Sequence, residues 1–324
     1  VLFRSGSNTS FSVVASNSPT SYTWQVSTNG GSTWTTITNT SPYSNATTAN
    51  LSITGVTYSM NGYQYRVSAT NSCGTSPYST TATLSIVYCS YTNTNSTLYY
   101  ISNFTTTNGT SNISNPTTFS TNGYGNYTGQ TVSQFPGYSV NYSITSGNGT
   151  MNYGIWVDWN NDFDFLDANE NPVLTSSMAN STSGLITVPA GTPAGNYRMR
   201  VTSEWMSGSA VSCVGSSYGE AEDYTFNVLA LVVPTITSFS PSSVCSNGTV
   251  VITGTNFTGV SSVSVGLTSV SSFTLNSSTQ ITATVGTGTT GTIKVTVPGG
   301  TATSSSNLTI NQLPNVSVSP TSGT

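Results

Sequence analysis

Short runs in which apolar and polar residues alternate recur along most of this 324-residue chain. Alternation with a period of two places the apolar side chains on one face of a β-strand. Clusters of Asn, Gly, Ser and Pro separate the runs at intervals typical of sandwich strands, and Asn29-Gly30-Gly31 predicts a hairpin turn. The sequence therefore predicts an all-β protein, built from tandem antiparallel β-sandwich modules in a linear array.

The first stretch resembles an immunoglobulin-like domain over residues 6–87. Five runs carry the pattern: Phe11–Val13, Tyr22–Val26, Leu51–Ile53, Tyr63–Val67 and Leu84–Ile86. The resemblance implies that Trp24 is the core tryptophan and that Tyr65 lies on the strand with the tyrosine corner. Val67 stands where many relatives have cysteine. Residues 1–5 differ in composition from the rest of this stretch, and we interpret them as a cloning or sequencing scar outside the fold.

The last stretch, residues 231–311, resembles an IPT/TIG domain, which is another Ig-like sandwich. The resemblance rests on Ile236–Pro241, Gly248–Phe257, Val263–Val265, Gln280–Thr284 and Ile293–Gly300. After it, Val316-Ser-Val-Ser-Pro320 reads as the first strand of a further module, so residues 312–324 are expected to be the start of a truncated one. Both ends are interpreted as breaks in a longer protein.

The middle stretch, residues 88–230, is similar to the GEVED domain. The similar segments are Tyr99–Asn103, Gly154–Asn160, Arg198–Val201 and the terminal run Tyr218–Val228, which contains Gly219-Glu-Ala-Glu-Asp223. Ala221 replaces the usual valine of the motif, which is a conservative change on a strand. The resemblance implies a third β-sandwich between the other two.

Charge is scarce and unevenly distributed. Charged residues make up 4% of the chain, so its solubility comes from Ser, Thr, Asn and Gly. All nine acids fall between Asp158 and Asp223, where only Arg198 and Arg200 oppose them, and the middle module therefore carries −7. An acidic cluster of this kind indicates a cation as partner. The absence of a basic patch argues against nucleic acid.

From Asp158 to Asp164, side chains with oxygen ligands recur at every second position, which is a spacing suited to a hard cation. We expect a structural calcium ion, Ca²⁺, held by Asp158, Asn160, Asp162, Asp164, Asp167 and Glu170. The loop is not an EF-hand, because Phe163 stands where glycine is required and Asn169 where the final glutamate belongs. GEVED relatives usually have glycine at Phe163, and a bulky residue resists a positive φ.

Two alternatives for the acids stay open at this point. The carboxylates of the loop could decorate a solvated hairpin without a metal. Glu220, Glu222 and Asp223 face an Arg-Met-Arg strand, and cross-strand ion pairs with Arg198 and Arg200 are expected there.

Four cysteines are present, without C-x-x-C spacing and without any histidine, so zinc is not expected. The GEVED resemblance implies a disulfide between Cys89 and Cys213, and a disulfide implies export. Relatives of the first module often pair a cysteine such as Cys73 with one before the first strand, a stretch that this chain lacks. Cys245 has no evident partner in its own module and could pair elsewhere or remain a buried thiol.

These features predict a non-catalytic protein. The chain has no histidine, no serine with a plausible base and no phosphate loop, and its carboxylates are too dense and local for a glycosidase pair. We expect an extracellular or cell-surface segment of a multidomain adhesin-like or spacer protein, without a membrane span, whose partners are a surface protein or glycan and further modules. The alternative is an accessory region of a secreted hydrolase or peptidase, with carbohydrate as a candidate ligand for exposed Trp159 and Trp205.

Overall fold

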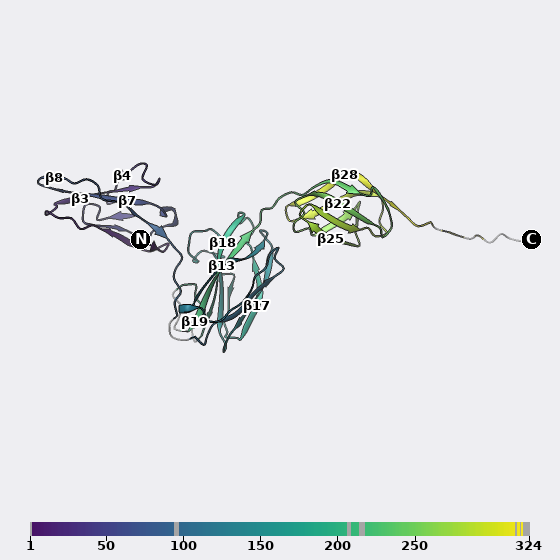
Figure 1. The fold of residues 1–324 in the computed structure, drawn as a ribbon, viewed down its shortest axis with the longest axis horizontal. Coiled ribbons are helices and arrows are strands. Elements are labelled where there is room, and N and C mark those ends of the chain that lie inside the picture. Colours follow the sequence, from purple (N-terminus) through teal and green to yellow (C-terminus); the bar gives the residue numbers. More distant parts are fainter. Residues whose placement is uncertain are drawn as a thin grey trace, which may run out of the picture. The chain divides into compact units, whose positions relative to one another are not determined.

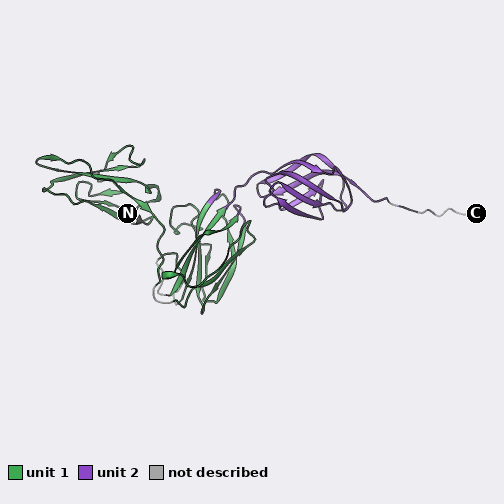
Figure 2. Ribbon diagram, viewed as in Figure 1, with its two compact units in different colours: residues 1–133, 139–192, 196–227 green, residues 134–138, 193–195, 228–324 purple. Residues whose placement is uncertain are grey.

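The computed structural model describes residues 2–93, 97–205, 209–213, 218–314, 316, 317 and 319. Strands dominate, and the two short 3₁₀ turns are η1 (Tyr58–Met60) and η2 (Thr121–Gly123) (Figure 1). The chain forms two compact units (Figure 2): residues 1–133, 139–192 and 196–227 make up unit 1, and residues 134–138, 193–195 and 228–324 make up unit 2. The predicted fold class, tandem antiparallel β-sandwiches, is confirmed. The four predicted domain ranges stay a prediction.

The N-terminal part of unit 1 packs two main sheets around one core. One sheet has the order β2-β6-β5; the other has the order β4-β3-β7-β8, with β9 also paired to β7. The bounds are β2 (Thr9–Ser12), β3 (Ser21–Ser27), β4 (Thr35–Thr36), β5 (Tyr43–Ser44), β6 (Asn50–Ile53), β7 (Gln64–Asn71), β8 (Gly74–Thr75) and β9 (Ala82–Thr83). Trp24 lies in this core, as predicted, and its indole N–H donates to the Thr48 carbonyl over 2.9 Å. Tyr65 stacks on Phe11 with ring centroids 4.6 Å apart.

The N-terminal residues take part in this fold, contrary to the sequence interpretation. Strand β1 (Leu2–Phe3) pairs in parallel with β10 (Ser85–Ile86). In addition, Arg4 donates to the Ser90 hydroxyl over 3.1 Å. Backbone pairing with a later strand, which an alternation pattern cannot predict for so short a segment, includes these residues in the sheet.

The remainder of unit 1 contains a second pair of sheets. Their orders are β12-β11-β14-β17 and β13-β19-β18-β15-β16. The bounds are β11 (Ile101–Thr107), β12 (Ser114–Pro116), β13 (Tyr124–Gln134), β14 (Ser139–Ser146), β15 (Asn152–Val157), β16 (Val173–Leu174), β17 (Ser181–Thr187), β18 (Gly195–Glu204) and β19 (Gly219–Val228). Every residue of β15 is buried, and antiparallel pairing with β18 places Trp156 opposite Arg200. The acidic loop follows directly after this buried strand, so its first residue is fixed by the sheet.

Unit 2 contains a further sandwich with the sheet orders β20-β22-β26-β25 and β21-β28-β27-β23-β24. The bounds are β20 (Thr235–Ser240), β21 (Ser243–Cys245), β22 (Thr249–Thr255), β23 (Ser262–Val265), β24 (Thr268–Ser269), β25 (Ser272–Ser277), β26 (Gln280–Thr284), β27 (Gly291–Val297) and β28 (Gly300–Asn311). Alternate residues of β22 and β27 supply its core, including Ile252, Ile293 and Val295. After β28, the described residues 312–314, 316, 317 and 319 form no strand, and Val318 of the predicted strand lies outside the described residues.

Candidate metal site

The acidic loop is closed at its base by the backbone. It runs from the end of β15 to the start of β16, and the Val157 N–H donates to the Glu170 carbonyl over 2.7 Å. The Asp158 N–H donates to the Arg198 carbonyl of β18 over 3.0 Å. Both ends of the loop are therefore tied to the central strands, which fixes the first and last acids relative to each other.

Within the loop, side-chain oxygens accept from backbone N–H groups two residues further on. Asn160 Oδ1 accepts from Asp162, Asp162 Oδ1 from Asp164, and Asp164 Oδ1 from Leu166, over 3.0, 3.1 and 2.9 Å. Successive Asx turns of this kind wind the chain tightly. This winding turns residues spaced by two toward one centre, as the ligand pattern requires.

Carboxylate oxygens from the loop converge in two overlapping groups. Oxygens of Asp158, Asp162 and Glu170 lie within 4.8 Å of one another, and so do oxygens of Asp162, Asp164 and Asp167. Asn160, the sixth predicted ligand, donates from Nδ2 to Asp167 Oδ2 over 2.6 Å. The structure thus brings the six predicted residues together in one loop, with Asp162 shared by both groups. Burial raises the pKa of Asp162, the hydrogen bond from the Asp164 N–H lowers it, and the charges of Asp164, Asp158 and Asp167 raise it further, because charges this close repel.

Glu170 is the most unusual member of the cluster. Its side chain is 1% exposed, and Oε2 accepts from the Asp167 N–H over 3.3 Å. Oε1 is buried and has no hydrogen-bond partner among the described residues. The pKa of Glu170 is raised to about 8, chiefly by burial and secondly by the negative charge of Asp158. A buried carboxylate oxygen without a donor costs free energy, which a cation at the centre of the cluster would offset.

Phe163 adopts the left-handed backbone that its side chain disfavours. Its φ is 68°, the region that glycine occupies without steric cost. Its N–H donates to Asp158 Oδ2 over 3.0 Å, and its ring stacks on Tyr88 with centroids 4.8 Å apart. The expected obstacle to the ligand turn is therefore overcome here, because the stacking contact and the hydrogen bond hold the strained residue in place.

The expected ion pairs of the terminal motif form only in part. Asp223 pairs with Arg198 over 2.8 Å and with Arg200 over 2.7 Å. The expectation that Glu220 and Glu222 also pair with arginine is wrong. Successive residues of β19 point to opposite faces, so both glutamates face away from the side on which Asp223 meets the arginines.

The two glutamates are instead buried acceptors. Glu220 accepts from the backbone N–H groups of Ile101 and Ser120 over 2.9 and 2.7 Å. Glu222 accepts from the hydroxyls of Thr117 and Tyr224 over 2.9 and 2.7 Å. Burial raises the pKa of both, and that of Glu222 reaches about 8, with a contribution from the Glu220 charge. These two acids therefore organise the sheet packing of their module.

The sequence did not indicate the contact of Tyr88 with the site, and the exposure expected for Trp159 is wrong. The Tyr88 hydroxyl donates to Asp158 Oδ2 over 2.6 Å, although 70 residues separate them in sequence. No short-range spacing could have indicated this contact. Trp159 was expected to be exposed but is 8% exposed, packed against Tyr197 and Phe226. Trp205 is half-buried.

The disulfide that the family resemblance implies is present. Cys89 and Cys213 form a disulfide with Cα atoms 5.4 Å apart. Cys73 and Cys245 are free and exposed, so the alternative of a buried thiol for Cys245 is wrong. Strand β21, which ends at Cys245, is an edge strand paired on one side with β28, and this position leaves the thiol in solvent.

Two family models match the chain. Residues 152–227 match the GEVED domain and residues 234–311 match the IPT/TIG domain. The molecule is thus a tandem β-sandwich protein of the Ig-like class, and the chain carries a GEVED domain followed by an IPT/TIG domain. The acidic loop and the β18–β19 ion pairs both lie inside the GEVED match. Among the described residues, no helix is long and apolar enough to cross a membrane.

Matches to whole proteins are distant. No curated protein matches the chain. Among solved structures, SGBP-B from a xyloglucan utilization locus of Bacteroides uniformis is 19% identical, with 65% of this chain and 49% of that chain covered and a TM-score of 0.25. The eight N-terminal Ig domains of the Down Syndrome Cell Adhesion Molecule are 10% identical, with 96% and 40% covered and a TM-score of 0.25. The chain thus spans about half the length of these structures or less, and at such values the likeness carries no argument about function.

Proposed function

We propose that this chain is a non-catalytic segment of an extracellular multidomain protein, of the adhesin-like or spacer kind, whose GEVED-containing module is stabilised by a structural calcium ion. The observation that carries the calcium proposal is the unpartnered, buried Oε1 atom of Glu170, which belongs to the same cluster as the oxygens of Asp158 and Asp162. Calcium prefers six to eight oxygen ligands, and the six residues at Asp158–Glu170 supply oxygens of that kind.

A spacer role is supported by the way each sandwich is built. The first and last sandwiches have separate apolar cores, and the buried Glu220 and Glu222 of the middle one are hydrogen-bonded to neighbouring residues. Rigid, hydrogen-bonded sandwiches in one chain are suited to hold a remote binding region at a distance. Calcium would add rigidity to the acidic loop of the middle module by neutralising its repelling acids.

The second candidate is an accessory region of a secreted hydrolase or peptidase that contacts carbohydrate. It is favoured by the half-buried Trp205, whose ring stacks on Tyr99 at 4.4 Å and meets Tyr218 edge-on at 5.3 Å. A half-buried indole is able to contact a sugar ring with its exposed part. Trp159 does not contribute, because it is buried.

Thermal unfolding of the full chain, with calcium and with chelator, tests the calcium proposal. A ligand of the native state raises the midpoint by mass action, by an amount equivalent to about 2.7 kcal/mol at a concentration of about 100 times Kd. We expect a calcium-dependent rise that Asp162→Ala abolishes. The control Asn161→Gly lies in the same loop at φ 58° and should keep the rise. If the wild-type midpoint does not respond to calcium, the acids of the loop hold no calcium ion and the proposal is wrong.

A further inference from the structure

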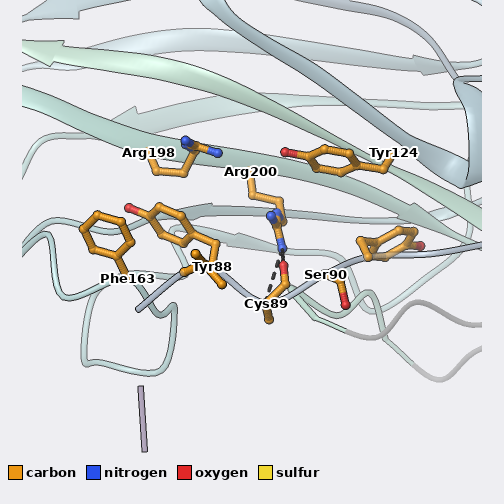
Figure 3. Close-up of a pocket in the computed structure, with 9 residues that line it drawn as sticks. Tyr88, Cys89, Ser90, Tyr124, Phe163, Arg198 and Arg200 are labelled. Carbon is orange, nitrogen blue, oxygen red and sulfur yellow. Dashed lines mark hydrogen bonds between the residues drawn. The ribbon is translucent and has the colours of Figure 1, made fainter. Parts of the chain in front are cut away.

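A groove of about 390 Å³ opens beside the calcium loop, and no part of the proposed function uses it. Its lining includes four aromatic residues, two guanidinium groups and one serine hydroxyl: Tyr88, Tyr91, Tyr124, Phe163, Arg198, Arg200 and Ser90. Figure 3 shows the rings of Tyr88 and Phe163 next to each other, with Tyr124 on the other side of Arg200. A concave, largely apolar site with a few polar groups is the usual form of a small-ligand site.

The acid that pairs with both arginines, Asp223, is already saturated. Asp223 Oδ1 accepts from Arg200 Nε over 2.7 Å. Asp223 Oδ2 accepts from Arg200, Arg198 and the Tyr124 hydroxyl over 2.9, 2.8 and 2.8 Å. Arg200 is 1% exposed and also donates to the Cys89 and Ser212 carbonyls. Arg198 makes one hydrogen bond to this carboxylate, whereas Arg200 makes two, so Arg198 is the less saturated of the two guanidinium groups.

The guanidinium of Arg198 has hydrogen-bond donors that no described residue uses. Its side chain is 27% exposed, and only one terminal nitrogen is used, for Asp223. Among the described residues, Nε and the other terminal nitrogen have no hydrogen-bond partner, while the guanidinium lies 4.7 Å above the Tyr88 ring. These two donors form the side-on fork of the guanidinium, which matches the two oxygens of a carboxylate. The geometry therefore complements a carboxylate that enters over Tyr88.

We propose that this groove binds the carboxylate of an acidic sugar, a uronic acid residue in a glycan. The Arg198 fork takes the carboxylate, the ring of Tyr124 on the other side of Arg200 covers the apolar face of the sugar ring, and the exposed Ser90 hydroxyl lies at the rim for a sugar hydroxyl. The volume accommodates one or two sugar units. A long run of uronic acids is disfavoured, because the module carries nine acids against two arginines.

The groove shares a wall with the calcium loop. Phe163 belongs to the loop, and Tyr88 is tied to Asp158 by its hydroxyl. An ion that fixes the loop would fix this wall, so sugar affinity should rise with calcium. This coupling rests on the proposed function, whereas the sugar site itself does not.

Ligand-detected NMR and calorimetric titration of the full chain test the proposal, with galacturonate as the probe and galactose as its uncharged counterpart. We expect galacturonate to bind at least about tenfold more tightly than galactose, because two charge-assisted hydrogen bonds are lost in galactose. Equal binding, or no binding of galacturonate, would overturn the carboxylate assignment. Tighter binding of N-acetyl-aspartate than of galacturonate would overturn the choice of a sugar.

Arg198→Lys keeps the charge beside Asp223 but removes the fork, and it should weaken galacturonate binding at least about tenfold. The matched control is Arg66→Lys, since Arg66 lies between Trp34 and Tyr78 at 4.1 and 4.3 Å in another sheet. Equal losses in both variants would indicate nonspecific anion binding and contradict the site. Chelator separates the two proposals: weaker binding without calcium supports the coupling, and unchanged binding removes the coupling but leaves the site.

Discussion

The hydroxyl of Tyr88 donates a 2.6 Å hydrogen bond to Oδ2 of Asp158, so the segment that enters the middle module is bound to the first acid of the acidic loop. Asp158 is fully buried. Its two oxygens also accept from the N–H groups of Asp162 and Phe163. Tyr88 thus acts on the loop through Asp158 and through stacking on Phe163, and it connects the candidate metal site with the groove beside it.

Tyr88→Phe should destabilise the loop without disturbing the aromatic stack. The phenyl ring keeps its contact with Phe163, but Asp158 loses a donor, and a hydrogen bond to a charged group contributes about 2 kcal/mol. Hydrogen exchange measured on the full chain should show faster exchange in loop peptides and unchanged exchange in β22. Equal exchange in wild type and variant would show that this hydrogen bond does not hold the loop.

Glu222 should make the middle module less stable as the pH rises. Its pKa in the folded protein is about 8, against 4.5 for an ordinary glutamate, chiefly because it is buried. Between these values the folded state binds more protons than the unfolded state, so stability decreases with increasing pH and the loss is complete above about pH 8.

Glu222→Gln should remove this part of the pH dependence. An amide can donate to the Thr117 hydroxyl, as a protonated acid would, while that hydroxyl donates to the Ile101 carbonyl. Urea unfolding at about pH 5 and about pH 8.5, in chelator, should therefore show a smaller difference for the variant. An identical difference in both proteins would mean that Glu222 does not titrate in this range.

Loss of the Cys89–Cys213 disulfide should strongly destabilise its module. The bridge closes a sequence separation of 124 residues. The chain-entropy model gives about 5 kcal/mol for a loop of this length, as an upper figure. A double Cys→Ala variant should unfold at lower urea concentration in the transition of this module, and the transition of the IPT/TIG module should stay unchanged. A shift of both transitions would contradict a local role.

Asp223→Asn should be more damaging than substitution of a surface acid. Burial alone would raise the pKa of Asp223, but the hydrogen bonds and charge of Arg200 lower it, so the carboxylate is ionised. The variant leaves Arg200, which is 1% exposed, without its counter-ion, and such a change costs about 3–5 kcal/mol. A double variant, Asp223→Asn with Arg200→Met, should recover part of the loss. No recovery would show that the unpaired charge is not the cause.

Local pattern was sufficient for much of this fold. Period-two alternation predicted the strands around Trp24 and Ile293, and ligand spacing collected the acids from Asp158 to Glu170. Neither alternation nor spacing along the sequence predicts contacts between distant segments. The Tyr88 hydroxyl bond and the parallel pairing of Leu2–Phe3 depend on chain segments far apart in sequence.

Two errors have a different cause. Glu222, like Asp223, is expected to pair with the Arg-Met-Arg strand, yet strand geometry turns adjacent residues to opposite faces. Trp159 is expected to be exposed, but it packs in the core against Phe226. In both cases the direction of the side chain decides its environment.

Calcium titration calorimetry of the full chain, with the wild type and Glu170→Gln, tests the central claim most directly. Glutamine keeps the shape of Glu170 but removes the charge that the buried Oε1 atom brings to the cluster. We predict one calcium ion bound per wild-type chain and at least about tenfold weaker binding in the variant. Absence of stoichiometric calcium binding by the wild type, or equal binding by both proteins, would contradict the account.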